Sequence, residues 1–310
     1  MSALPHIDIH APPLAAVPPK AVSPVHVGQG VTPLPLPLPA AAAPSRWQRF
    51  SQGRAAAVLL GALSIASVLL FWQLATYYKL DAYVRFNNIP TPSQVMEKVV
   101  EVNGSPKFVT NIGISVRRIL LGFLVATALG VGLGVVVGRY RVVRALAMPA
   151  MEVFRPIPAI AWVPMSIMLW PDNEVSIVFI TFLGAFFPNL LNTVHGVEAI
   201  DPVLLRAART LGAGEASLLR HVVLPGALPH IFTGLAVGMG VAWVSLIAAE
   251  MISGQFGIGY FTWEAYSLIS YAEIALGMIT IGMLGLLCSG AIRLLARLAM
   301  PWQAHSTGGR

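Results

Sequence analysis

The side chains of this sequence that are able to do chemistry are charged residues set inside or beside long apolar runs. Glu152 and Arg155 interrupt one run, and Glu250 stands at the end of another. A charge in a lipid-like environment is costly, so these residues are candidates for a substrate pathway. Glu152 and Arg155 are three residues apart and can pair on one helix face. Alternatively, Arg155 faces a pore and attracts an anion, or the two residues form a gate near the inner end of their segment.

Single side chains at other positions in or beside the apolar runs give further expectations. We expect Glu250 to be a carboxylate at the membrane interface. Trp162 and Trp243 either line a cavity or pack as tryptophans in membrane segments commonly do. His195 is expected to be a solvated boundary residue, because no second His or Cys lies at metal-ligand spacing. The single cysteine, Cys288, excludes a disulfide framework and a multi-thiolate metal site, so we expect no bound metal.

The composition indicates a protein whose solvent is lipid. Of 310 residues, 56% are hydrophobic and 11% are charged, and the mean hydropathy is +0.73. Soluble domains carry about 25% charged residues, so a soluble enzyme of this length is excluded. The net charge is +7, but the basic residues are scattered among apolar runs. Without a basic face to lie along a phosphate backbone, a nucleic-acid partner is excluded as well.

Six apolar runs predict an all-α, polytopic membrane protein with about six transmembrane helices. A spanning helix needs about 20 apolar residues. The third run is ambiguous, because Glu152 and Arg155 interrupt it and Pro149, Pro156, Pro158 and Pro164 break it. The predicted spans are residues 55–78, 119–138, 145–171, 175–194, 226–249 and 274–292.

Charge asymmetry predicts which side of the membrane each terminus occupies. Six spans place both termini on one side, and the segments on that side hold 13 Lys and Arg against 6 on the other. This bias favours cytoplasmic termini. Residues 1–45 hold 11 of the 24 prolines and are expected to be a disordered cytoplasmic tail rich in Pro and Ala. The remaining predicted parts are a first transmembrane helix with an external amphipathic segment (46–111), a core (112–300) and a cytoplasmic C-terminal tail (301–310).

Glycines at four-residue spacing predict close contacts between helices. Gly130, Gly134 and Gly138 form one series, and Gly234 and Gly238 form another. Residues without a Cβ allow helix backbones in a membrane to approach closely.

A polar segment between the fourth and fifth spans predicts two short helices. Asp201 and Pro202 are suited to the first helix start, and Gly212 supplies a left-handed stop. A second helix is expected from Gly214, and Pro225 is expected to end it before the fifth span. The pair is either an amphipathic hairpin on the lipid surface or a rigid lever that fits a groove on a soluble partner.

This segment resembles the EAA loop of ABC-importer permeases. Arg206-Ala207-Ala208, three residues, Gly212, nine residues and Val222-Val223-Leu224-Pro225 match the spacing of that motif. Arg206 stands where the family usually has Glu, and Val222 replaces Ile. The resemblance favours the lever and extends over residues 90–300. It includes Phe154–Pro164, Phe186–Thr193, and Ala248–Met251 followed by Gly257–Gly259, which are similar to permeases for nitrate, aliphatic sulfonates and taurine.

The resemblance implies a type I ABC-importer (MetI-like) permease fold and a pore subunit without catalytic chemistry. It implies two permease copies forming a homodimer in the bacterial inner membrane, and a periplasmic or extracellular binding protein that delivers the substrate. A cytoplasmic ATPase dimer would bind ATP and Mg²⁺, since this chain has no Walker-type phosphate loop. Glu250 is then alternatively a gate or a contact with the binding protein. The residues expected to couple to the ATPase are Asp201, Arg206, Ala207, Ala208, Gly212, Leu224 and Pro225, and those expected in the substrate pathway are Glu152, Arg155, Trp162 and Glu250.

Three other functions stay open from the residues. One is an ABC permease for another small solute, such as a vitamin precursor. Another is an ion-coupled secondary transporter, which usually shows internal repeats that this sequence lacks. The third is a membrane-embedded enzyme or sensor, which needs a cluster of His, Asp or Cys that we do not find.

Overall fold

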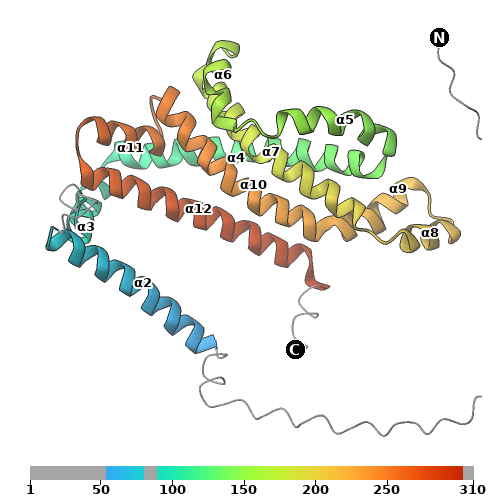
Figure 1. Cartoon of the computed structure of the whole chain (residues 1–310), viewed down its shortest axis with the longest axis horizontal. Helices are drawn as coiled ribbons and strands as arrows, with labels where there is room; N and C mark the ends of the chain where they lie inside the picture. Colours follow the sequence, from blue (N-terminus) through green and yellow to red (C-terminus); the bar gives the residue numbers. More distant parts are fainter. Residues whose placement is uncertain (1–53, 80–88, 303–310) are drawn as a thin grey trace, which may run out of the picture. The chain divides into compact units, whose positions relative to one another are not determined.

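The computed structural model describes residues 54–79 and 89–302, and every regular element in that part of the chain is helical (Figure 1). The predicted tail 1–45 lies outside the described residues. Contacts between residues divide the chain into two units, Met1–Gly61 and Ala62–Arg310. The helix bundle belongs to the second unit. The elements are α2 (Arg54–Tyr77), α3 (Pro92–Asn103), α4 (Pro106–Arg139), α5 (Arg141–Phe154), η2 (Ala159–Trp162), α6 (Val163–Leu169), α7 (Asn173–Glu198), α8 (Pro202–Thr210), α9 (Glu215–Leu218), the π-helical turn η3 (Leu219–Val223), α10 (Leu224–Ser253), α11 (Ile258–Ser267) and α12 (Tyr271–Ala299).

Five helical stretches in the described residues are long and apolar enough to cross a membrane. They confirm the predicted first, second, fourth, fifth and sixth spans, and the chain is a multi-pass membrane protein. Each stretch exceeds the roughly 20 residues that span the hydrocarbon core. They are Val58–Tyr77, Pro106–Arg139, Asn173–Glu198, Glu215–Ser253 and Tyr271–Ala299.

Helices α4, α7 and α10 form the centre of the bundle, and glycines set their contacts. A Cβ added at Gly134 would lie 2.6 Å from Thr193 Cβ, and one at Gly138 would lie 2.8 Å from Val197 Cβ. Residue numbers rise together along this contact, so α4 and α7 run parallel. On the other face of α7, a Cβ at Gly234 would lie 2.7 Å from Asn192 Cβ. The predicted glycine contacts are therefore confirmed, and each brings two backbones into dispersion contact.

The predicted third span, 145–171, is not one helix. It is divided into α5 of 14 residues and α6 of seven, with a break at Arg155–Pro158. Neither piece alone reaches the roughly 30 Å of a hydrocarbon core. Proline explains the break, because Pro156 and Pro158 lack the backbone donors that would continue α5. Because α4 and α7 run parallel, the chain must travel back from the end of α4 to the start of α7. Residues 140–172 make this return crossing as a series of short helices and not as one long helix.

Helix α3 forms an amphipathic helix within 46–111, the part of the chain for which an amphipathic segment is predicted. Thr91 caps its start, accepting a hydrogen bond from the Gln94 N–H at 3.2 Å. Its apolar side packs with α11 and α12 around Phe108, Phe261 and Leu276. Lys98 bonds to Glu101 at 3.0 Å and to Glu273 at 3.1 Å, and these contacts raise the pKa of the Lys98 ammonium above its ordinary value. The helix is thus attached to the bundle.

Candidate functional site

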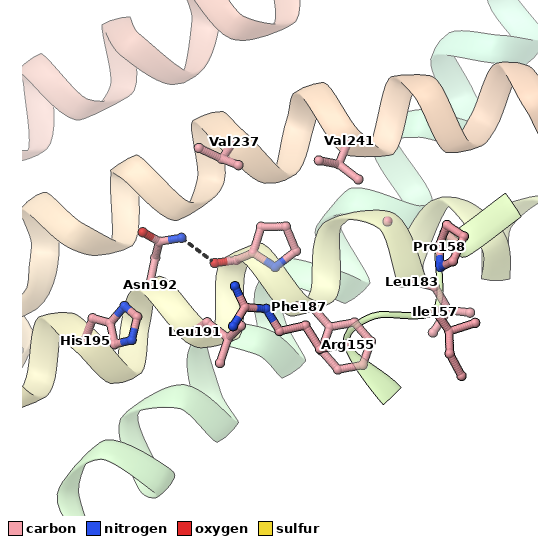
Figure 2. A pocket seen from close by; sticks show the side chains of 13 residues that line it. Arg155, Ile157, Pro158, Leu183, Phe187, Leu191, Asn192, His195, Val237 and Val241 are labelled. Atoms are coloured by element: carbon pink, nitrogen blue, oxygen red, sulfur yellow. Dashed lines mark hydrogen bonds between the residues drawn. The ribbon is translucent and has the colours of Figure 1, made fainter. Parts of the chain in front are cut away.

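A cavity of about 420 Å³ lies where the break after α5 meets α7 and α10 (Figure 2). Most of its lining is apolar, from side chains such as Leu183, Phe187 and Val237. Its polar lining side chains are Arg155, Asn192 and His195. Among the described residues, no aspartate or glutamate lines it. A mostly apolar cavity with a few convergent polar groups is the usual form of a small-molecule site.

Arg155 enters the cavity because α5 ends there. Its backbone N–H bonds to the Met151 carbonyl at 2.9 Å and closes the last turn, and the chain then leaves the helix at Pro156. Figure 2 shows the Arg155 side chain turned toward α7, on the side lined by Leu191 and His195. Within residues 54–79 and 89–302, no carboxylate pairs with Arg155. The guanidinium is therefore available to an anion.

The predicted pair between Glu152 and Arg155 does not form. Glu152 is exposed on α5 and does not line the cavity. The i,i+3 spacing brings side chains together only while both residues lie within a continuing helix. Here Arg155 is the cap residue of α5, beside the break. The hypothesis of a self-satisfied pair is wrong in this structure, and the reading in which Arg155 faces a cavity stays.

The sequence did not single out Asn192, and His195 was predicted only as a solvated boundary residue. His195 is exposed as predicted, but it also lines the cavity, three residues beyond Asn192 on α7. The Asn192 amide donates to the Pro188 carbonyl at 2.9 Å, which holds the side chain beside the cavity. The spacing of Pro188, Asn192 and His195 along one helix face is the signal that could have found this set.

Trp162 and Trp243 have different positions. Trp162 lines an apolar cavity of about 140 Å³ together with Phe154, Phe179 and Phe187. This cavity shares Phe187 with the Arg155 cavity, so the two are neighbours. Trp243 is 5% exposed and belongs to the core formed with Ile180 and Leu246, as expected for a packing tryptophan.

The two short helices α8 and α9 form the predicted hairpin (residues 201–220). Asp201 caps α8, accepting a hydrogen bond from the Val203 N–H at 2.8 Å. Gly212 has φ +86°, the left-handed conformation that ends a helix and that glycine adopts most easily. Leu205 packs inward against Val197 and Val223, whereas Leu211 is 88% exposed. The hairpin thus has an inner side fixed to the bundle and an outer apolar side that no described residue covers.

Pro225 does not end a helix, contrary to prediction. Helix α9 continues through η3 into α10, so residues 215–253 form one continuous helical stretch. The Leu224 N–H bonds to the Leu219 carbonyl, five residues back, in a π-helical turn. Pro225 then occupies the start of α10. A wider turn accommodates a residue that has no backbone donor, so the α9 end of the hairpin is joined directly to a membrane helix.

Ion pairs join the two arms of the hairpin beside its turn and connect them to α4. The Glu215 carboxylate accepts hydrogen bonds from Arg139 at 2.8 Å and from Arg209 at 2.7 Å. Arg139 is the last residue of α4, and Arg209 lies in α8. Arg206 and Ala207 are exposed on α8, and Ala208 is half-buried. These contacts connect both arms of the hairpin to the end of α4.

Glu250 is not an interfacial carboxylate, and that prediction is wrong. Its side chain is fully buried, and it accepts a hydrogen bond from Arg118 at 2.9 Å. Ser115 and the Gly259 N–H also donate to it, at 2.8 Å and 2.9 Å. Arg118 is 2% exposed and pairs at its other side with Glu174 of α7. A buried carboxylate needs such partners, because desolvation of an unpaired charge is costly.

The Glu250 network explains the glycines that follow α10. Gly257 has φ +114°, and a Cβ there would overlap the Glu250 carboxylate. Its N–H donates to Asn111 at 3.0 Å, and the next N–H, of Ile258, donates to Ser115 at 2.9 Å. The network therefore joins α4, α7, α10 and the start of α11, and Glu250 is outside the Arg155 cavity.

Comparison with known proteins identifies the family. Residues 126–304 match the model of the binding-protein-dependent transport system inner membrane component. The chain belongs to this family of ABC transporter permeases. A putative ABC transporter permease of Methanocaldococcus jannaschii is 37% identical, over 77% of this chain and 90% of its own. The taurine transport permease of Escherichia coli is 30% identical (84% and 94%), and the nitrate import permease of Synechocystis is 31% identical (79% and 90%).

Membership of this family confirms the fold and the resemblance inferred from the sequence. The all-helical membrane architecture is that of a type I ABC-importer permease. The family is defined by transport that depends on a binding protein, and its members work with an ATPase and a substrate-binding protein. The chain is accordingly a membrane subunit of an ABC importer.

Proposed function

We propose that this chain forms the translocation pathway of an ABC importer for a small anion such as nitrate, taurine or an aliphatic sulfonate. The observation that carries the proposal is the Arg155 cavity: about 420 Å³, one guanidinium without a carboxylate partner, and no acidic residue in the described lining. Relatives named for taurine and nitrate transport support this substrate class. The anion would bind Arg155 first, with Asn192 and His195 as further polar contacts.

The pathway is more limited than the sequence suggested. Arg155 and Trp162 line neighbouring cavities, and we keep both in the proposed pathway. Glu152 is exposed outside the cavity, and Glu250 is buried in a network of its own, so neither is proposed to contact the substrate. A pathway without these two carboxylates suits an anion, because a carboxylate beside Arg155 would compete with the anionic substrate for the guanidinium.

The hairpin is proposed to be the contact with the motor. In this proposal the α8–α9 hairpin lies in the cytoplasm of a bacterial cell, with both termini, and a separate ATPase dimer binds ATP and Mg²⁺. Val203, Leu204 and Leu211 offer an exposed apolar surface for that partner. Because α9 continues into α10, displacement of the hairpin would move a membrane helix directly. Asp201, Arg206, Ala207, Ala208, Gly212, Leu224 and Pro225 are the proposed coupling residues.

Two copies of this chain are proposed to form the pore, with a periplasmic or extracellular binding protein on the side opposite the hairpin. The chain itself is proposed to be non-catalytic. Charged residues of α3 and α11, including Glu101 and Glu264, are available to a docking protein on that side.

The test is transport by the complete complex, reconstituted in proteoliposomes with its ATPase and binding protein. A screen of the binding protein against nitrate, taurine and methanesulfonate first selects the substrate. Arg155→Ala should then reduce uptake at least about tenfold, the effect of losing one charge-assisted contact, whereas Arg155→Lys should keep part of it. Glu152→Ala, three residues away and outside the cavity, is the matched control. Equal uptake by Arg155→Ala and the wild type would refute the anion pathway.

A further inference from the structure

A third cavity lies at the hairpin end of the bundle and shares no lining residue with the Arg155 or Trp162 cavity. It has a volume of about 220 Å³ and lies among the ends of α4 and α7 and the starts of α5 and α8. Its charged lining consists of Arg139, Arg141, Arg144 and Glu198. Three arginines and one glutamate thus line this space.

The ion pairs in this region do not use all of that positive charge. Arg144 pairs with Glu198, and Arg139 pairs with Glu215 through Nη2. Arg141 has no ion pair to any described residue. When Glu215 and its second partner Arg209 are counted as well, four arginines share two carboxylates, so positive charge stays in excess.

A buried donor in the same place is also unsatisfied. The Nε of Arg139 is buried and has no hydrogen-bond partner within the described part of the chain. An N–H group removed from water without an acceptor costs free energy, so such a group calls for an unobserved partner. Arg139 and Arg141 flank the junction of α4 and α5, and their guanidinium donors suit the oxygen atoms of a phosphate group.

The position of the cavity selects the kind of anion. Arg139 directly follows the apolar run 119–138, so the cavity lies at the boundary where lipid headgroups begin. Basic cavities between membrane helices are suited to anionic headgroups. Val197, Ile200 and Leu205 supply apolar wall beside the arginines, which suits the glycerol and acyl parts of a lipid.

We propose that this cavity binds a phosphate group, from an anionic phospholipid headgroup or from soluble phosphate, with Arg139 and Arg141 as its main ligands. Arg144 adds positive charge beside them. Because Arg139 also holds Glu215 of the hairpin, the bound phosphate would connect the membrane surface to the hairpin beside its turn. This site is separate from the proposed substrate pathway and needs no transport to be detected.

The experiment is a thermal unfolding titration of the full-length chain in detergent at fixed ionic strength. The added probes are short-chain phosphatidylglycerol, short-chain phosphatidylcholine and sodium phosphate. Phosphatidylglycerol should raise the unfolding midpoint of the wild type, and phosphatidylcholine should not. Arg141→Ala should increase the half-saturating concentration roughly fivefold, as expected for one basic residue at an anionic headgroup. Arg141→Gln, which keeps a polar side chain but removes the charge, should have a similar effect.

The matched control is Arg293→Ala. Arg293 is an exposed basic residue in the last third of α12, and it does not line the cavity. Its titration should match the wild type. A shift by sodium phosphate that is lost in Arg141→Ala supports the site and names soluble phosphate as the source. Equal responses to the two lipids, with no response to phosphate, would overturn the proposal, as would equal behaviour of the Arg141 and Arg293 variants.

Discussion

One arginine–carboxylate pair is fully buried near one end of the bundle, and another is half exposed at the hairpin end. At the Glu250 end (Glu250, Arg118 and Glu174), Glu250 and Arg118 are 0% and 2% exposed. At the hairpin end, the paired side chains of Arg209 and Glu215 are 53% and 51% exposed. Both ends thus use arginine–carboxylate pairs, but in different dielectric surroundings.

This difference indicates different mechanical roles. Removing one partner of a buried pair leaves a desolvated charge and is strongly destabilising, whereas exposed pairs contribute little. The Glu250 end is therefore expected to hold α4, α7, α10 and α11 in one fixed arrangement. The hairpin end is held by weaker contacts that can be exchanged when a partner binds. A pore subunit moved by a separate motor needs such a combination, with one end fixed and the other able to respond.

The largest expected effect comes from Glu250→Ala. The change leaves Arg118 with Glu174 as its remaining carboxylate partner, and it removes the acceptor of Ser115 and of the Gly259 N–H. We expect a loss of about 3–5 kcal/mol in the free energy of unfolding, which is typical for breaking a buried pair. Thermal and denaturant unfolding in detergent, followed by circular dichroism, measures it.

The control for Glu250 is Glu264→Ala. Glu264 pairs with Lys107 at 2.9 Å, but Lys107 is 62% exposed, so this pair should contribute about 0–1 kcal/mol. Glu250→Gln, which keeps the shape and one of the two acceptor oxygens, should lie between the two. If Glu250→Ala were as stable as Glu264→Ala, the Glu250 end would not be the rigid end.

A smaller and more local effect is expected from Gly212→Ser. The added Cβ meets no atom within 4 Å, so its effect comes from the backbone, which is at φ +86°. Forcing a non-glycine residue into this conformation costs about 1–2 kcal/mol and should tilt the hairpin without unfolding the bundle. The measurement is stimulation of the partner ATPase by loaded binding protein, which should fall.

Gly214→Ser is the matched control for Gly212. Gly214 also has open space around it, but its φ is −72° and it occupies the N-cap of α9, where serine is favourable. The same replacement two residues away should therefore leave stimulation intact. Full stimulation in Gly212→Ser would show that the angle of the hairpin does not control coupling.

The helices and the hairpin could be predicted from the sequence because they depend on local signals. Apolar length located five spans, Asp201 and Gly212 located the ends of α8, and glycine spacing located the α4–α7 contact. The contact between Arg118 and Glu250 could not be predicted in this way, because 132 residues separate its partners. No local pattern distinguishes a buried carboxylate with such a partner from one at the membrane surface.

The candidate site was predicted only in part for the same reason. Arg155 was identified because a charge inside an apolar run is unusual at any position. Asn192 and His195 were not, because their contribution depends on which face of α7 meets the break after α5. Proline at 156 and 158 indicated an interruption, but the direction of the chain after it depends on packing against α7 and α10.

The smallest effect is expected from Glu215→Ala, which removes the link between Arg139 and Arg209. The Arg139 side chain is 17% exposed, but Glu215 is half exposed, so salt screens both of its contacts and the unfolding midpoint should change little. Coupling should change more than stability, because the link holds the hairpin to the end of α4. At low ionic strength, we expect ATPase stimulation in Glu215→Ala to be lower than in the wild type. Added salt weakens the Arg139–Glu215–Arg209 link in the wild type, so the difference between the two proteins should shrink as salt is added. A large loss of stability in this variant would mean that both ends of the bundle are equally rigid, and the contrast between them would not hold.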